Sequence, residues 1–366
     1  RDLVRSRGLG DVYKRQITWF YPVSMDEGEL GVFFRLWKSV YKKVFQQEPD
    51  EDKIKGIPES IAPYLFYKSE VKGLSLSIDI GGGSSDLAVF NENDIKGKAK
   101  LISSFKFAGN AIFGDGYPSG EFKNNSDRNG FVNTFRKAAY DAIKGDKQKE
   151  GILNDILQNR KNSSDFSSYL FALEQDSSID FKYSRYLEKD KKIKLTVLLF
   201  YGAIAYYSAK LLKKSNITEI PRYILLSGTG SKSASIIDTS EKFKNLSEMF
   251  QFVFEKVYGE QSKNKMSIRL SKIPKEVTCK GALKANISEN IIDVPTKFWI
   301  GGKQNDRWNS VFDKDSDMQK TPRYFDIQSQ ALPDIESSIH DFYSIIDNYI
   351  RTINLKACLL YTSTSP

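Results

Sequence analysis

A run of three glycines directly behind an apolar strand constrains this chain of 366 residues more than any other feature. Leu74–Ile80 has the pattern of a buried strand, Gly81-Gly82-Gly83 follows, and Asp86–Phe90 has the pattern of a second strand. Three consecutive glycines cost more backbone entropy than a turn requires, but a turn without Cβ atoms lets main-chain N–H groups approach an anion. The segment therefore predicts a β-hairpin whose turn binds phosphate, with a plain glycine turn as the alternative.

Polar side chains beside this turn indicate the chemistry of the predicted site. Asp79 stands at the end of the buried strand, where its carboxylate is placed to hold a hydrated Mg²⁺ next to phosphates. Ser84 adds a hydroxyl at the same mouth of the turn. A buried aspartate needs a partner, because an unpaired charge in a protein interior is costly. We therefore predict that Asp79 is the magnesium residue and that it acts through water.

A second glycine-rich turn lies far along the chain. The apolar strand Tyr223–Ser227 opens into Gly228-Thr229-Gly230-Ser231, and a helix is expected after it. Gly228 and Gly230 would let a flat ring or a phosphate lie against the backbone, although a plain strand-to-helix turn has the same pattern. The phosphate loop Gly-x-x-x-x-Gly-Lys-Ser/Thr is absent from the sequence, and this turn lacks the third glycine of a dinucleotide-binding fingerprint.

The remaining pattern alternates strands and helices, which predicts an α/β fold. We expect a helix with apolar residues at three- and four-residue spacing over residues 30–44, a polar loop over 48–55, and mostly helical structure over 124–190. The other predicted strands are 17–23, 100–107 and 297–300. The other predicted helices are 58–67, 195–212, 240–257, 277–285 and 334–355.

Composition and charge exclude several classes of protein. The chain has 55 basic and 46 acidic side chains and a net charge of +9, but the lysines are scattered among acidic residues as on a solvated surface, so we expect no nucleic-acid partner. Two cysteines and one histidine are too few for a disulfide framework or a Cys/His zinc site. The apolar core Leu195–Ala209 is shorter than the roughly 20 residues of a membrane span. We therefore expect a buried helix there, no membrane partner and a cytoplasmic location.

Four segments occur in an order that resembles a known superfamily. Asp-Ile-Gly-Gly-Gly-Ser-Ser-Asp, residues 79–86, resembles the second phosphate motif of the actin, sugar-kinase and heat-shock-chaperone ATPases. Residues 227–231 resemble the adenosine motif of these proteins, and residues 281–285 resemble their second connecting helix, in which small residues let two helices cross closely. Residues 58–67 resemble the first connecting segment, although Pro63-Tyr64 stands where the family has small residues.

The resemblance implies a two-lobed, actin-like ATPase fold of the ribonuclease-H type that is incomplete at its N-terminus. Residues 17–70 would be the remainder of lobe I, and residues 71–285 would be lobe II, with a variable helical insertion at about 124–190 near the purine. Residues 286–357 would return to lobe I. The first phosphate loop of the family, an Asp-x-Gly-Thr-like hairpin, is absent from the sequence and would lie before Ile17.

The resemblance also implies site roles and a function. Gly81, Gly82, Gly83 and Ser84 would hold the β- and γ-phosphates, Asp79 would orient Mg²⁺, and Glu59 and Asp86 would position water or metal. The residues that would bind adenosine are Gly228, Thr229, Gly230 and Ser231. We expect an ATP-driven switch of the actin or heat-shock-chaperone type that acts through a protein partner or by self-association. A filament-forming protein is one alternative, and a small-substrate phosphotransferase or exopolyphosphatase is another.

Both ends of the chain have a pattern that resembles sequencing-library DNA. Residues 11–16 (Asp-Val-Tyr-Lys-Arg-Gln) are encoded by GAT GTG TAT AAG AGA CAG, and the reverse complement of that DNA, read in a shifted frame, encodes residues 358–363 (Cys-Leu-Leu-Tyr-Thr-Ser). We therefore expect residues 1–16 and 358–366 to be adapter-derived, as in a fragment, and we exclude them from fold reasoning. A fragment without the first phosphate loop should bind ATP weakly and hydrolyse it little.

Overall fold

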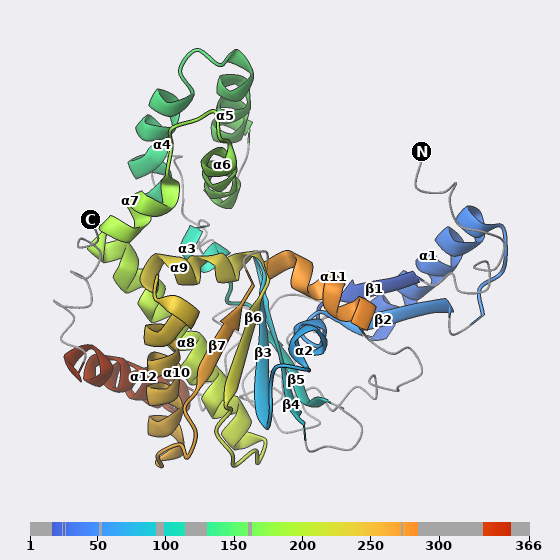
Figure 1. The fold of residues 1–366 in the computed structure, drawn as a ribbon, viewed down its shortest axis with the longest axis vertical. Helices are drawn as coiled ribbons and strands as arrows, with labels where there is room; N and C mark the ends of the chain where they lie inside the picture. Colours follow the sequence, from blue (N-terminus) through green and yellow to red (C-terminus); the bar gives the residue numbers. More distant parts are fainter. Residues whose placement is uncertain are drawn as a thin grey trace.

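The fold is known from a computed structural model, which describes residues 17–23, 25, 27–50, 53–92, 99–113, 130–159, 163–271, 274–284 and 332–352 (Figure 1). The described strands are β1 (Ile17–Tyr21), β2 (Ile54–Pro58), β3 (Leu74–Ile80), β4 (Ser85–Asn91), β5 (Ala99–Phe105), β6 (Tyr223–Ser227) and β7 (Ser267–Leu270). The described α-helices are α1 (Glu27–Phe45), α2 (Ala62–Tyr67), α3 (Asn110–Phe113), α4 (Gly130–Ile143), α5 (Lys147–Asn159), α6 (Ser163–Gln175), α7 (Tyr183–Lys189), α8 (Lys191–Lys214), α9 (Ala234–Ile237), α10 (Lys244–Tyr258), α11 (Pro274–Lys284) and α12 (Leu332–Thr352). Two short 3₁₀ helices are η5 (Thr229–Ser233) and η6 (Glu241–Phe243).

A mixed sheet forms the centre of the larger lobe. Its strand order is β5-β4-β3-β6-β7, with β4 antiparallel to both of its neighbours and β3, β6 and β7 parallel to one another. This is the strand order of a ribonuclease-H-like sheet, and the predicted glycine hairpin is its β3–β4 pair. Strands β3 and β6 begin and end at the predicted residues, because each is an apolar run closed by glycine.

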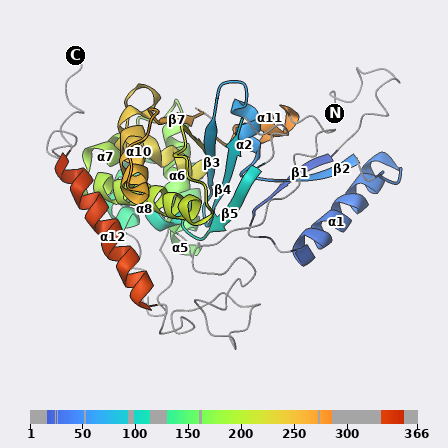
Figure 2. The ribbon, with the colours of Figure 1, turned by 90° about the horizontal axis from the view of Figure 1, so that it is seen from below.

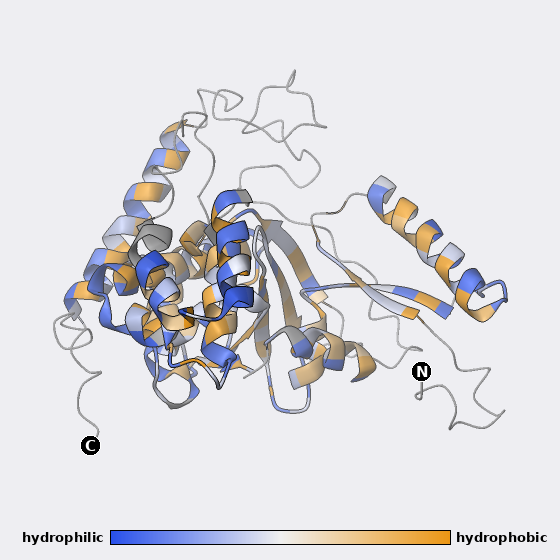
Figure 3. Cartoon of the chain, turned by 90° about the horizontal axis from the view of Figure 1, so that it is seen from above, coloured by the Kyte–Doolittle hydropathy of each residue, from blue (hydrophilic) through white to orange (hydrophobic). Residues whose placement is uncertain are grey.

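Helices cover both faces of this sheet (Figures 1 and 2). Alternate side chains of a strand point to opposite faces, so Leu76 and Ile78 of β3 join a core with α8 and α10. On the other face, Phe90 of β4 and Leu225 of β6 pack with α2 and α11. In Figure 3 the strands of the central sheet are coloured largely hydrophobic, whereas the helices alternate between hydrophobic and hydrophilic residues. The sheet is therefore the middle of three layers.

Helix α8 runs through the main core, as its apolar sequence predicts. By length and composition it is the one described helix that could cross a membrane, but 56% of its apolar window is buried inside the fold. The carboxylate of Asp190 caps its first turn by accepting hydrogen bonds from the N–H groups of Lys192 and Ile193, at 2.8 and 3.1 Å. Side chains of the sheet and of the neighbouring helices therefore surround much of its apolar surface.

A smaller unit contains the parallel pair β1–β2 and the crossover helix α1 (Figure 2). Its core is mostly aromatic and includes Trp19 and Tyr41. The sequence predicts a polar loop over 48–55 and a helix over 58–67. The end of the loop and the start of the helix are wrong, because residues 54–58 form strand β2 and helix α2 begins at Ala62. Gly56 of this strand lies under the Trp19 ring, where an added Cβ would be 3.0 Å from ring carbons. The apolar cover of β2 therefore comes from a side chain of β1, and the sequence of β2 itself does not show it.

The two predicted connecting helices, α2 and α11, cross in close contact between the two units. A Cβ added at Gly281 would lie 1.9 Å from the carbonyl oxygen of Ala62, so the backbones touch at this point. The Pro63-Tyr64 pair does not prevent the crossing, because Ala62 makes the contact and the Tyr64 ring instead stacks on Phe90, with 3.9 Å between ring centroids. The small-residue crossing inferred from residues 281–285 is therefore present over the described part, which ends at Lys284.

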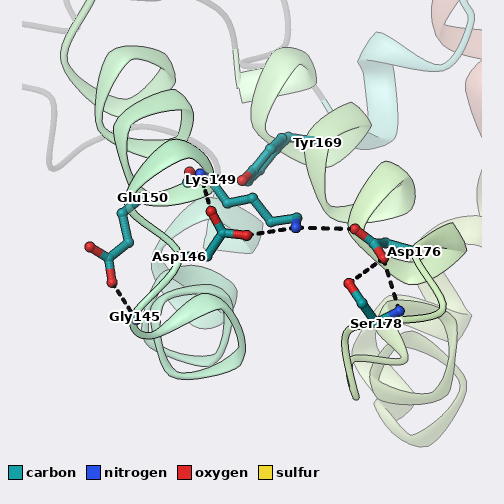
Figure 4. A network of polar contacts seen from close by, with 7 residues as sticks. All are labelled: Gly145, Asp146, Lys149, Glu150, Tyr169, Asp176 and Ser178. Carbon is teal, nitrogen blue, oxygen red and sulfur yellow. Dashed lines mark hydrogen bonds and ion pairs between the residues drawn. The ribbon is translucent and has the colours of Figure 1, made fainter.

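The described part of the predicted insertion consists of helices α4 to α7, which project from the sheet (Figure 1). Figure 4 shows the polar network that connects α5 with the end of α6. The Lys149 ammonium pairs with Asp146 at 2.7 Å and with Asp176 at 3.2 Å, and Tyr169 donates a hydrogen bond to the Lys149 carbonyl. The Ser178 hydroxyl and N–H, together with Lys149, lower the pKa of Asp176 to about 2. These contacts fix α6 against its neighbours.

Helix α12 lies where the sequence did not place it. The prediction returns residues 286–357 to lobe I, but α12 packs on α8 and α10 of the larger lobe. A Cβ added at Gly202 of α8 would lie 2.7 Å from Ile346, and Asp341 bonds both Tyr206 and Lys210 at 2.8 Å. Residues 285–331, with the strand predicted at 297–300, lie outside the described residues.

Candidate nucleotide site

The carboxyl ends of β3 and β6 bring the two glycine turns together. These strands are parallel neighbours, and their register pairs Asp79 with Ser227. The Ser227 hydroxyl donates a hydrogen bond to Oδ2 of Asp79 at 2.8 Å, and the Thr278 hydroxyl of α11 lies 3.5 Å from the same oxygen. Parallel strands end at the same edge of a sheet, where ligands of open α/β sheets commonly bind. The turn after each strand therefore opens at one edge.

Gly228 and Gly230 let the second turn lie directly on the first. Gly228 has φ +78° and ψ 159°, a conformation that is essentially restricted to glycine. A Cβ there would lie 2.3 Å from the Ile80 carbonyl oxygen and 2.5 Å from Oδ1 of Asp79. A Cβ on Gly230 would lie 2.7 Å from the Gly81 carbonyl oxygen. These two glycines are therefore required for contact between the turns.

A third segment completes the floor of the site. The N–H of Gly109 donates to the Gly81 carbonyl at 3.0 Å, and the N–H of Asn110 donates to the Gly82 carbonyl at 2.8 Å. A Cβ on Gly109 would also lie 3.5 Å from the Gly230 Cα atom. The sequence analysis gave these two residues no role in the site. A glycine four residues after the end of β5 was the available signal, but a single glycine in a loop is common.

The three segments and helix α6 line a cavity of about 270 Å³ that is open to solvent on one side. The lining residues from the turns and from α3 are Gly81, Gly82, Gly109, Asn110, Phe113, Thr229, Gly230, Lys232 and Ser233. The lining residues from α6 are Ser167, Ser168, Phe171, Ala172 and Gln175. One wall is thus polar backbone, and the opposite wall combines two aromatic rings with hydroxyl and amide groups. This composition is typical of a small-molecule site.

The predicted binding residues divide into those on the cavity and those that shape it. Gly81, Gly82, Thr229 and Gly230 line the cavity. Gly83 and Ser84 lie at the tip of the hairpin and are not among the lining residues, and the Ser84 carbonyl accepts a hydrogen bond from Gly81 at 3.0 Å.

Gly228 and Ser231 are also outside the lining set. The sequence assigns Ser231 to adenosine, but its side chain is buried inside the turn, where its hydroxyl donates to the Gly228 carbonyl at 2.6 Å. Its structural position is therefore that of a brace within the turn.

Two buried carboxyl groups face each other across the hairpin. Asp79 and Asp86 are direct partners in the β3–β4 register and are 8% and 2% exposed. Burial raises the pKa of Asp79, and the hydrogen bonds from Ser227 and Thr278 offset part of that effect. Burial, with smaller contributions from the charges of Glu59 and Asp79, raises the pKa of Asp86 to about 7. Of the three predicted catalytic carboxyl groups, Asp86 therefore responds to the charges of the other two.

The carboxyl pair offers oxygen atoms that can bind a hydrated cation. One Asp86 oxygen, Oδ1, is buried and has no hydrogen-bond partner among the described residues. The raised pKa values indicate that the pair lacks compensating positive charge. Within the described part of the chain, no group of three such side chains is arranged to ligate a metal directly. The donor set therefore fits a cation held through water, rather than a fully protein-ligated metal.

Asp86→Asn is expected to stabilise the protein in magnesium-free buffer. The folded-state pKa is about 7 against the usual 3.8, so ionisation of Asp86 removes stability as pH rises from the lower value through the upper one. Asparagine stays neutral, and we expect a gain on the order of 2 kcal/mol at pH 8 that shrinks towards pH 5. Urea unfolding of both proteins between pH 5 and pH 8 measures the difference in their free energies of unfolding. A gain that does not change with pH, or a loss of stability, would contradict the raised pKa of Asp86.

Comparison with known proteins gives structural likeness only. No family model matches the chain, and no curated protein matches its sequence. Among solved structures, the ethanolamine utilization protein EutJ from Carboxydothermus hydrogenoformans is 13% identical, with 73% of this chain and 64% of that chain covered and a TM-score of 0.36. The chain thus spans less than two thirds of that protein's length.

A second solved structure, MreB 5 of Spiroplasma citri bound to AMPPNP, is 14% identical, with 76% and 70% covered and a TM-score of 0.35. The description of the fold rests on the structure of this chain: on its sheet order, its crossed connecting helices and its paired glycine turns. The described residues have an α/β fold, with a five-stranded sheet of ribonuclease-H-like strand order in the larger of two units.

Proposed function

We propose that the chain binds ATP with Mg²⁺ in the cavity between its glycine turns and that hydrolysis switches its conformation. The observation that carries this proposal is the contact between two glycine turns from neighbouring parallel strands, beside a pair of buried carboxyl groups. Main-chain N–H groups at such turns suit phosphate oxygens, because glycine leaves the backbone open to close approach. A volume of about 270 Å³ suits a nucleoside-sized group.

The lining residues indicate how a nucleotide would lie. Gly81 and Gly82 lie nearest the carboxyl pair, so we place the phosphates there. Thr229 and Gly230 face α6, and we place the nucleoside between this turn and the rings of Phe113 and Phe171. Those two rings meet edge to face, with 5.7 Å between centroids, and give that end of the cavity an apolar surface for a base.

Asp79 would hold the magnesium ion through water, and Asp86 and Glu59 would orient water at the same edge. When bound, Mg²⁺ supplies positive charge that neutralises the phosphates. Glu59 follows β2 of the smaller unit, and its N–H donates to the Tyr21 carbonyl at 3.0 Å, so its backbone position is fixed by that unit. A change in the crossing of α2 and α11 would therefore move Glu59 relative to Asp79. A partner, or a second copy of the chain, would read that movement.

Asp79→Asn tests the proposal. Asparagine keeps an oxygen that can accept the Ser227 hydrogen bond but removes the charge, so we expect the fold to persist and the affinity for Mg-ATP to fall at least about tenfold. Binding is titrated by calorimetry into the millimolar range of ATP, with and without Mg²⁺. Affinity for magnesium-free ATP should change little.

The control for this test is Asp347→Asn, an exposed aspartate of α12 that pairs with Arg351 and is far from the cavity lining. It should leave both affinities unchanged. Equal Mg-ATP affinity in Asp79→Asn and the wild type would reject the magnesium role. Absence of ATP binding by the wild-type chain under these conditions would reject the proposed function.

A further inference from the structure

We propose that Tyr201 of α8 is a positioning residue of the nucleotide site, holding the second glycine turn in its binding conformation through a buried hydroxyl. This inference rests on the proposed function and adds a residue that the sequence analysis did not consider. Tyr201 is fully buried and is not among the residues that line the cavity. It can therefore act on a ligand only through the turn.

The hydroxyl of Tyr201 meets the turn at two points. Its single proton is shared between two acceptors, the Ser231 carbonyl at 3.1 Å and the Ser233 hydroxyl oxygen at 3.0 Å. Ser233 in turn donates to the Gly230 carbonyl at 2.8 Å. The phenol thus reaches, directly or through one serine, the backbone of the residues that form one wall of the cavity. Burial raises the pKa of Tyr201, which keeps the hydroxyl protonated and able to donate.

The turn needs such a support because it is short and built from small residues. It is a single 3₁₀ segment, Thr229–Ser233, preceded by Gly228. Short 3₁₀ segments have poor hydrogen-bond geometry, and glycine adds backbone freedom. The Ser231 hydroxyl braces the turn from within, by its bond to Gly228. The bonds from Tyr201 connect the turn to α8, which is fixed in the main core.

Phe200, the residue before Tyr201, is connected to the first glycine turn. The Phe200 ring packs on Phe107, with 5.0 Å between centroids, and the Phe107 carbonyl accepts a hydrogen bond at 2.7 Å from Ser85, which follows the first glycine turn. Two consecutive residues of α8 therefore connect to both turns: Tyr201 to the second turn directly, and Phe200 to the first turn through Phe107 and Ser85. The phenol hydroxyl belongs to the second turn alone, so its loss should affect the nucleoside end of the site.

Tyr201→Phe is the direct test, because it removes one oxygen and keeps the ring. We expect affinity for ATP and for ADP to fall by the same factor, about tenfold, as for a lost buried hydrogen bond. The loss should be independent of Mg²⁺, unlike that of Asp79→Asn. In steady-state ATPase assays KM should rise while kcat changes little. Both readouts are taken well below the melting temperature of each variant.

Tyr258→Phe is the matched control, because it also removes a tyrosine hydroxyl that donates to a main-chain carbonyl. The Tyr258 hydroxyl of α10 donates to the Ile217 carbonyl at 2.8 Å, and neither residue lines the cavity. Its change should leave nucleotide affinity unchanged. A second variant, Ser233→Ala, removes the other end of the same bond, so the double variant with Tyr201→Phe should bind no more weakly than the weaker single variant.

The outcomes separate the inference from the function on which it rests. A wild-type chain that binds nucleotide, with Tyr201→Phe binding equally well, would overturn the positioning role and leave the function standing. Equal losses in Tyr201→Phe and Tyr258→Phe would show general loosening of the fold and would also overturn the positioning role, as would additive losses in the double variant. No nucleotide binding by the wild type would reject the function itself.

Discussion

Gly281→Ala should destabilise the protein by about 3 kcal/mol or more, because the new methyl group would collide with backbone. Its Cβ would lie 1.9 Å from the Ala62 carbonyl oxygen and 2.7 Å from the carbonyl carbon. No side chain can rotate to relieve such a contact, so α2 and α11 must separate. Residues packed at the crossing, including Val277, would lose contacts as the helices part. Urea unfolding measures the change.

The control for this substitution is Gly151→Ala in α5. That glycine is also within a helix, and a Cβ there would meet no described atom within 4 Å. Alanine should stabilise the helix by up to about 1 kcal/mol, since it has the higher helix propensity. Opposite signs at the two positions are the expected result. A neutral Gly281→Ala would contradict the close crossing of the two connecting helices.

Gly228→Ala should abolish measurable nucleotide binding. The residue has a backbone conformation that alanine rarely adopts, which alone costs on the order of 1–3 kcal/mol. The added Cβ would also press on the Ile80 carbonyl and on the carboxylate of Asp79. Relief requires the second turn to move away from the first, which would open the cavity. The measurement is ATP titration of the folded variant, with circular dichroism to confirm its secondary structure.

Gly259→Ala separates backbone strain from collision. Gly259 closes α10 with the same φ of +78°, but a Cβ there would meet no described atom within 4 Å. It should cost about 1 kcal/mol of stability and leave nucleotide affinity unchanged. If Gly259→Ala weakened binding as strongly as Gly228→Ala, the effect would be one of stability and not of contact between the turns.

Much of the sheet could be predicted because its strands carry local signals. Strands β3 and β6 have the apolar pattern of buried strands and are each followed directly by glycine, so both signals place the ends of the strands at the same residues. Strand β7 escaped prediction because it has only four residues, so its alternation of polar and apolar side chains is a short and weak signal. Strand β2 escaped prediction because Lys55 and Gly56 interrupt the alternation of apolar side chains. The Trp19 ring of β1 covers Gly56 and provides the apolar contact that a side chain of β2 would otherwise make.

The site was predictable only where a glycine turn is visible in the sequence. Gly81, Gly82, Thr229 and Gly230 were assigned to a nucleotide and line the cavity. The wall formed by α6 has no local signature, because Phe171 could equally be a core residue of any helix. Only the tertiary fold turns that face of α6 towards the glycine turns. Tyr201 was hidden for the same reason, since a tyrosine in an apolar helix predicts burial and nothing about its hydroxyl.

The cavity has walls of separate structural origin. The glycine turns belong to the sheet, whereas α6 belongs to the projecting helices and is braced there by Lys149 and Asp176 (Figure 4). Contact with the phosphates and contact with the rest of a ligand would therefore come from different elements of the fold. Substitutions at the α6 residues that line the cavity would change which ligand fits while the main-chain groups of the glycine turns stay the same.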